Sequence, residues 1–161
     1  MYSVSTPNSE LDPQRSRALL ELADVVAQRR DAAEALIESE QLLATYFKAY
    51  KVGFCILDTD FRYLAINHPM AEMNGFPAEA HLGKSVREML GDFAELIEPQ
   101  FKRVLETEQP ILNLEISSKL PTRTEPGQWI EHYIPIKDPT GKVKQIGVIA
   151  VEITAQKKLE A

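Results

Sequence analysis

The chain has 161 residues but only one cysteine, Cys55, so it can form neither an internal disulfide bond nor a multi-cysteine metal site. A lone thiol fits a reducing compartment, and we expect a cytoplasmic location. No apolar run approaches the roughly 20 residues of a membrane-spanning helix, so we expect no membrane contact. The net charge is −6, and residues 1–47 carry 4 basic and 8 acidic side chains. Direct nucleic-acid binding is therefore not expected.

Motifs for catalysis are lacking as well. The sequence contains no nucleophile motif, phosphate-binding loop or metal-binding helix pattern. His68, His81 and His132 are too far apart to form a local metal motif, and we expect the first two to face solvent. Glu131 adjoins His132 on a predicted strand, so the two side chains point to opposite faces and cannot act as an acid–base pair. We expect neither enzymatic activity nor a metal site.

The first third of the chain predicts a long helix. Residues 1–12 are rich in Ser, Thr, Pro and Asn, which is typical of a flexible tail. Asp12 before Pro13 is a helix-start pattern. Apolar residues then recur with heptad spacing over 13–47, which predicts a coiled-coil dimerisation helix; packing of this helix on its own domain is the alternative. The interface candidates in this segment are Leu19, Leu22, Val26, Leu36 and Leu43.

Beyond residue 48 the pattern changes to short elements of mixed type. Apolar segments at 52–57 and 61–67 flank a turn and predict a β-hairpin. Asn67 and Ser85 are candidate helix N-caps, and a glycine ends each of three short helical segments. A longer amphipathic helix is predicted over 93–108, where Pro99 is a point of kinking or division. The remaining predicted strands are 111–118, 129–136 and 143–153.

This order of elements resembles the PAS family of sensory domains over roughly residues 45–154. The motifs that carry the resemblance are Leu57-Asp58 with its turn, Asn67 with Ala71 to Phe76, Glu79 to Ser85, Asp138 to Gly141, and Glu152-Ile153-Thr154. Glu152 stands where the family usually has aspartate. The resemblance implies an α+β fold over residues 48–154, with a five-stranded antiparallel sheet in the order 2-1-5-4-3. Helices would cover one face of this sheet and enclose a pocket.

The resemblance also bears on cofactors. Family members that form a flavin adduct use a cysteine at the position that Val86 occupies here. Haem-binding members commonly use a histidine on the long helix, and residues 93–108 contain none. We therefore predict neither a flavin adduct nor haem, which leaves an unidentified small ligand as the remaining candidate.

Strand alternation divides the fourth strand into two faces. Trp129, Glu131 and Tyr133 share one face, and the resemblance turns that face toward the helices together with Cys55. The opposite orientation is the alternative. In the preferred orientation Ile134 lies on the outer face and joins the candidate dimer interface. The candidate pocket residues are Cys55, Leu57, Met70, Met73, Val86, Phe101, Trp129, Glu131, Tyr133 and Val148.

These patterns predict a sensory and dimerisation module of a signal-transduction protein, such as a sensor histidine kinase of a two-component system or a transcriptional regulator. The signal would pass through Glu152, Ile153 and Thr154 into a helix begun at residues 155–161 and on to a C-terminal effector domain. The Thr154 hydroxyl is predicted to cap that helix. The alternative is a ligand-free interaction scaffold that only sets dimerisation.

Overall fold

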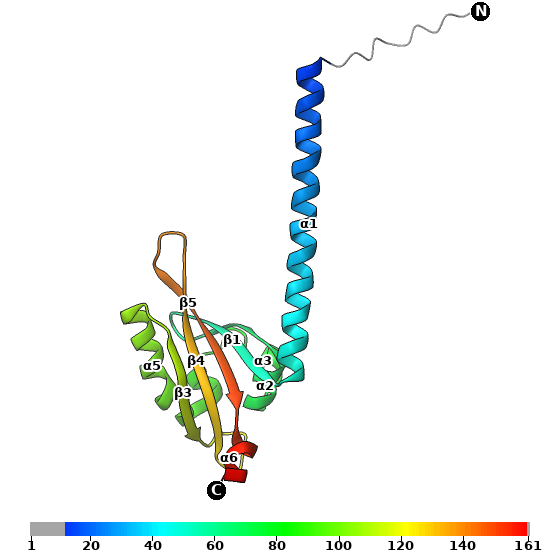
Figure 1. The fold of residues 1–161 in the computed structure, drawn as a ribbon. Helices are drawn as coiled ribbons and strands as arrows, with labels where there is room; N and C mark the ends of the chain where they lie inside the picture. The colour runs from blue at the N-terminus through cyan, green and yellow to red at the C-terminus, as the bar shows by residue number, and fades with distance from the viewer. Residues whose placement is uncertain (1–11, 161) are drawn as a thin grey trace, which may run out of the picture. The chain divides into compact units, whose positions relative to one another are not determined.

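The structure is a computed structural model that describes residues 12–160, so the predicted tail lies, apart from Asp12, outside the described residues. Helices and strands follow one another in the predicted order (Figure 1). Their bounds are α1 Pro13–Ala49, β1 Val52–Asp58, β2 Tyr63–Ile66, α2 His68–Asn74, α3 Ala78–His81, α4 Val86–Leu90, the 3₁₀ helix η1 Gly91–Phe93, α5 Ala94–Thr107, β3 Ile111–Ser118, β4 Gly127–Lys137, β5 Val143–Glu152 and α6 Thr154–Glu160.

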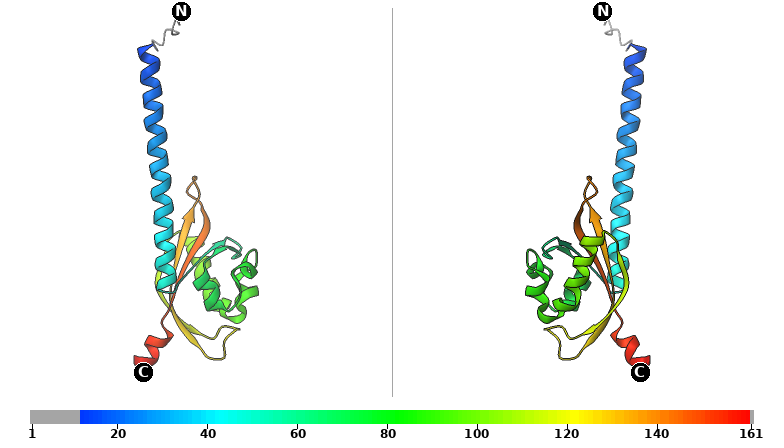
Figure 2. Two further views of the ribbon diagram at one scale, coloured as in Figure 1. Left: turned by 90° about the vertical axis from the view of Figure 1, so that its right-hand side faces the viewer. Right: turned by 90° about the vertical axis from the view of Figure 1, so that its left-hand side faces the viewer.

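The five strands form one antiparallel sheet in the order β2-β1-β5-β4-β3, which confirms the predicted topology. The short helices and α5 cover one face of it (Figure 2). Val148 on the central strand β5 lies opposite Cys55 of β1 and Tyr133 of β4. This register aligns the inward-facing residues of three strands into one row beneath the helices.

The chain divides into two units, one ending at Ala44 and the other beginning at Thr45. Helix α1 continues from the first unit to Ala49, and Asp12 begins it by accepting a hydrogen bond from the Gln14 amide at 3.3 Å. No side chain of α1 is buried. The predicted interface residues of this helix are between 50% and 59% exposed: Leu19, Leu22, Val26, Leu36 and Leu43.

None of the helices within residues 12–160 combines the length and hydrophobicity that crossing a membrane requires.

Caps and packing set the helix boundaries in the second unit. The Asn67 side chain accepts hydrogen bonds from the amides of Met70 and Phe54, at 3.0 and 2.9 Å, and so joins the start of α2 to β1. Pro99 lies inside α5, which is one uninterrupted helix, so the predicted division there does not occur. Burial of Ile97, Phe101 and Val104 on one stripe holds the helix together across the proline.

Candidate ligand-binding site

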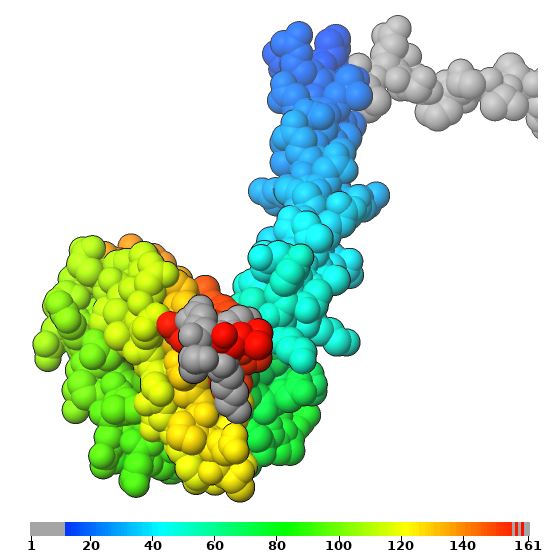
Figure 3. All heavy atoms as spheres, turned by 60° about the horizontal axis from the view of Figure 1, so that its bottom comes forward, coloured from blue at the N-terminus to red at the C-terminus, as the bar shows by residue number. Residues whose placement is uncertain are grey.

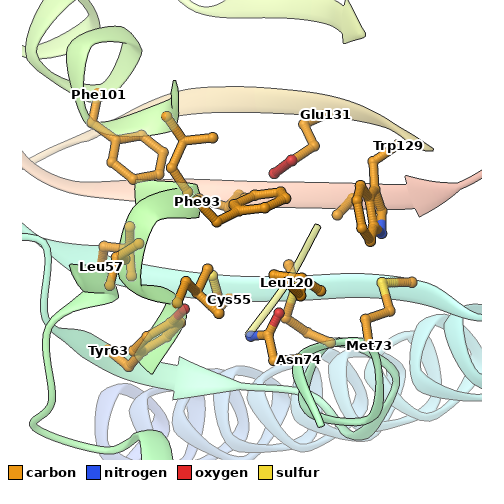
Figure 4. Close-up of a pocket in the computed structure, with 16 residues that line it drawn as sticks. Cys55, Leu57, Tyr63, Met73, Asn74, Phe93, Phe101, Leu120, Trp129 and Glu131 are labelled. Carbon is orange, nitrogen blue, oxygen red and sulfur yellow. The ribbon is translucent and has the colours of Figure 1, made fainter. Parts of the chain in front are cut away.

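An internal cavity lies between the sheet and the helices that cover it (Figure 4). Its volume, counted as the space open to the centre of a water-sized sphere, is about 30 Å³. A single water needs about 10–15 Å³ on this measure, so the cavity holds about two or three waters. The structure places nine of the ten predicted pocket residues on its wall: Cys55, Leu57, Met70, Met73, Val86, Phe101, Trp129, Glu131 and Val148.

Tyr133 is the predicted pocket residue that does not line the cavity. It is fully buried behind the wall, where its ring meets Phe101 edge-on at 4.8 Å. Alternation on β4 buries Trp129, Glu131 and Tyr133 and leaves Ile134 exposed, which matches the preferred orientation of that strand. The lining residues that sequence reasoning missed are Tyr63, Asn74, Leu90, Phe93, Ile97, Leu120 and Ala150.

Two aromatic rings form one end of the cavity. Trp129 and Phe93 meet edge-to-face, with ring centroids 5.4 Å apart and planes at 89°. The Trp129 ring lies directly over Gly127, where an added Cβ would come within 2.5 Å of it. Any side chain at Gly127 would therefore displace the indole from the cavity wall.

Among the described residues that line the cavity, Glu131 alone carries a carboxyl group. It is 5% exposed, and burial raises its pKa to about 7, an effect that a contact with Tyr133 partly offsets. The buried Tyr133 hydroxyl lies near Glu131 but forms no hydrogen bond of standard geometry with any described residue. Glu131 is thus a buried acid with little compensation from protein groups.

Asn74 is the main polar group on the opposite wall, and His81 orients it. His81 is fully buried, so the prediction that it faces solvent is wrong. Its Nδ1 donates to the Pro77 carbonyl at 3.0 Å, since a carbonyl can only accept, and in the neutral ring Nε2 accepts from the Asn74 amide at 3.2 Å. The rings of Tyr63 and Phe76 pack edge-on against the imidazole, which accounts for its burial.

The loop between β3 and β4 connects this wall to the end of the sheet. Leu120 lines the cavity, and the Thr122 hydroxyl donates to the Asn74 carbonyl at 2.7 Å. Arg123 lies over the Trp129 ring, 5.1 Å from its centroid, and forms two hydrogen bonds to the Glu152 carboxylate at 2.7 and 2.9 Å. Figure 3 shows this loop (yellow) at the surface near α6 (red). Sequence reasoning missed Arg123, and nothing in the local pattern distinguishes it from a surface charge.

The predicted transmission residues form the junction between β5 and α6. The Thr154 hydroxyl accepts a hydrogen bond from the Gln128 amide of β4 and donates to Glu152, each at 3.0 Å. Thr154 therefore joins the end of β5 to β4. Because it is the first residue of α6 and its hydroxyl bonds to the sheet, the predicted cap of α6 is a misassignment. The Ile153 carbonyl accepts from the Lys157 amide and so begins α6. Hydrogen bonding to Arg123 lowers the pKa of Glu152 and keeps this carboxyl group charged.

The single cysteine of the chain, Cys55, is buried. Burial raises the pKa of the Cys55 thiol far above its usual range, so the thiol stays protonated and unreactive. Within residues 12–160, no cluster of His, Cys, Asp and Glu side chains has the arrangement of a metal site.

The fold and the enclosed cavity define an α+β domain with helices packed over one face of a single antiparallel sheet. A family model described as PAS fold matches residues 47–158, and the chain belongs to this family. None of the curated proteins matches the chain at a significant level.

Solved structures with the same fold come from several signalling proteins. A sensory box sensor histidine kinase from Vibrio cholerae has a TM-score of 0.55 and 18% identity, covering 76% of this chain and 98% of that one. The PAS domain of Bordetella pertussis BvgS has a TM-score of 0.58 and 23% identity, covering 76% and 91%. The VqmA dimer of Vibrio cholerae has a TM-score of 0.61 and 21% identity, covering 73% of this chain and 52% of VqmA.

Proposed function

We propose that the chain is a cytoplasmic sensory module that detects a small molecule in its internal cavity and passes the change to a C-terminal effector. The observation that carries this proposal is the path from cavity to junction. Trp129 lines the cavity, Arg123 lies on its ring, and the same guanidinium holds Glu152 at the end of β5. One side chain thus contacts both the sensing site and the end of β5, two residues before the output helix begins at Thr154.

Because the cavity is small, ligand binding is coupled to movement of its wall. A ligand larger than a few atoms fits only if Met73 repacks or Leu120 moves outward, because both line the wall. Movement of Leu120 shifts Arg123, three residues further along the same loop. Binding would therefore alter the Arg123–Glu152 ion pair and, through it, the population of α6 orientations.

The wider assignment rests on the PAS family and on the exposed seam of α1. A helix of 37 residues without a buried side chain gains its stability from a partner, and a second copy of the same seam provides one. In this proposal the chain is a non-enzymatic homodimer within a sensor histidine kinase or a transcriptional regulator. One of the fold neighbours, VqmA, has been solved in a complex with ligand and DNA.

The second candidate function is a ligand-free scaffold that only sets dimerisation, and the small volume of the cavity favours it. Native mass spectrometry of the purified protein separates the two. A retained organic molecule supports the sensor. A dimer that carries no ligand, and to which none binds from a metabolite extract, supports the scaffold.

Arg123→Ala is expected to loosen α6 without unfolding the domain. The substitution removes the ion pair to Glu152 and the hydrogen bond from Arg123 to the Met73 carbonyl at 3.0 Å. A loss of about 1.4 kcal/mol at this junction corresponds to about tenfold faster exchange of the α6 amides. Hydrogen exchange measured by mass spectrometry checks this result.

The matched control for this change is Arg103→Ala on the exposed face of α5. Thr154→Ala is expected to speed exchange in the same direction, since it removes the hydroxyl that bonds to Glu152 and to the Gln128 amide in the same network. Unchanged exchange in both junction variants would remove the junction as the route of the signal.

Charge on the α1 seam is expected to weaken dimerisation. Leu22→Glu and Leu36→Glu place carboxylates at positions that face one another in a parallel coiled coil, and each should raise the dimer dissociation constant by at least about tenfold. Leu20→Glu and Leu42→Glu are the controls, because both residues are exposed but lie off the seam. Sedimentation equilibrium measures the dissociation constant. An unchanged dimer in the seam variants, or in a chain that lacks residues 1–44, would contradict a helix-mediated dimer.

A further inference from the structure

The cavity carries information about the chemistry of its ligand, and the inference drawn from it rests on the proposed sensory function. Glu131 points into the cavity from the sheet, and Asn74 points into it from α2 on the opposite side (Figure 4). The rest of the wall is almost entirely apolar or aromatic. These two side chains therefore set the polar requirements of any molecule that binds there.

Both groups present hydrogen-bond acceptors. The Glu131 carboxylate has only acceptor oxygens when ionised. The Asn74 amide nitrogen uses one of its two N–H bonds for His81 at 3.2 Å, and its oxygen is the acceptor end of the group. A ligand that satisfies both walls must supply hydrogen-bond donors.

None of the described residues that line the cavity carries a positive charge to balance Glu131. The other ionisable groups on the wall are the Cys55 thiol and the Tyr63 phenol, whose pKa values burial raises, so both stay neutral. The Arg123 guanidinium, which lies over the Trp129 ring, is already bound to Glu152. A buried carboxylate without a counter-charge is costly, and a cationic ligand would remove this cost.

The shape of the site restricts the cation further. Phe93 and Trp129, whose ring planes meet at 89°, line the same cavity, and an aromatic ring face attracts a cation. A planar group with two parallel N–H bonds also matches a carboxylate at both oxygens. We propose that the cavity binds a small, flat, amidinium-type cation, with two N–H groups on Glu131 and a further donor directed to Asn74.

Matched compounds test this proposal by titration calorimetry on the whole chain. Acetamidine and benzamidine have the required planar cation, acetamide and benzamide keep the shape without the charge, and acetate and benzoate reverse the charge. We expect the amidines to bind at least about tenfold more tightly than the amides, and the carboxylates not to bind. Two ligand sizes are used because the closed cavity restricts how large a group it admits.

Two variants test whether the ligand binds at Glu131. Glu131→Gln is expected to abolish the preference for amidines, whereas Glu106→Gln, the same change on the exposed face of α5, keeps it. The proposal is overturned if neither amidine binds, if amides or carboxylates bind as tightly, or if the preference survives in Glu131→Gln.

Failure of this proposal is distinguishable from failure of the sensory function. A neutral or anionic molecule retained in native mass spectrometry overturns the cation class and still supports a sensor. The sensory function itself fails if no molecule of any charge binds and the junction variants leave α6 exchange unchanged.

Discussion

Glu131→Gln is expected to stabilise the domain at pH 8 by about 2–3 kcal/mol. The pKa of Glu131 is about 7 in the folded protein, against the ordinary value of 4.5 in the unfolded chain. Each unit of difference corresponds to about 1.4 kcal/mol, and the glutamine amide loses part of this gain because it too is buried without full hydrogen bonding. Urea unfolding of both proteins at pH 8 measures the difference.

The sign of this effect depends on pH. Between pH 4.5 and about 7 the folded state holds more protons on Glu131 than the unfolded state does, so the stability of the wild-type domain falls as pH rises through this window. The advantage of Glu131→Gln should therefore be absent near pH 4.5 and complete above about pH 7. Glu106→Gln serves as the control and should show no such window. A gain that does not depend on pH would show that Glu131 is not a buried acid.

Phe101→Ala is expected to cost about 3–5 kcal/mol of folding free energy. Phe101 is 1% exposed and packs against both Tyr133 and Phe61, with ring centroids 4.8 and 5.3 Å away. Its loss joins a new void to the cavity beside the buried Tyr133 hydroxyl. Because domains of this size have about 5–15 kcal/mol of stability, the variant should approach the limit of folding. Thermal unfolding should show a melting temperature lower by roughly 10 °C or more.

Two controls isolate the packing effect at Phe101. Leu96→Ala removes a 47% exposed side chain from the same helix and should change stability by less than about 1 kcal/mol. Phe101→Leu keeps most of the side-chain volume, so its cost in folding free energy should lie between those of Leu96→Ala and Phe101→Ala. A cost below about 1.5 kcal/mol for Phe101→Ala would contradict the central position of this ring in the core.

Local periodicity explains how much of this domain could be predicted. Alternation on β4 was sufficient to place Trp129 and Glu131 on the same face, and apolar spacing was sufficient to place Phe101 on the inner stripe of α5. Turn and cap residues such as Asn67 bounded the elements because their hydrogen bonds reach nearby backbone groups. These features depend on neighbours only a few positions away, so they can be read along the chain.

The contacts that define the site depend on partners far apart in the sequence. Arg123 meets Glu152 and Met73 only because the β3–β4 loop folds back over the end of the sheet. Thr154 resembles a helix cap in the sequence. In the structure its hydroxyl instead accepts a hydrogen bond from the Gln128 amide, which strand pairing brings close to it. His81 is buried because rings from β2 and from the segment after α2 pack on it.

The sequence by itself therefore determined the order of the elements and the faces of the strands, since both arise from short-range periodicity. Only the tertiary structure decided the size of the cavity, the Asn74 wall and the Arg123 link to α6. The cavity size and these two contacts depend on close packing between segments that are far apart in the sequence. No local sequence pattern shows that such segments meet.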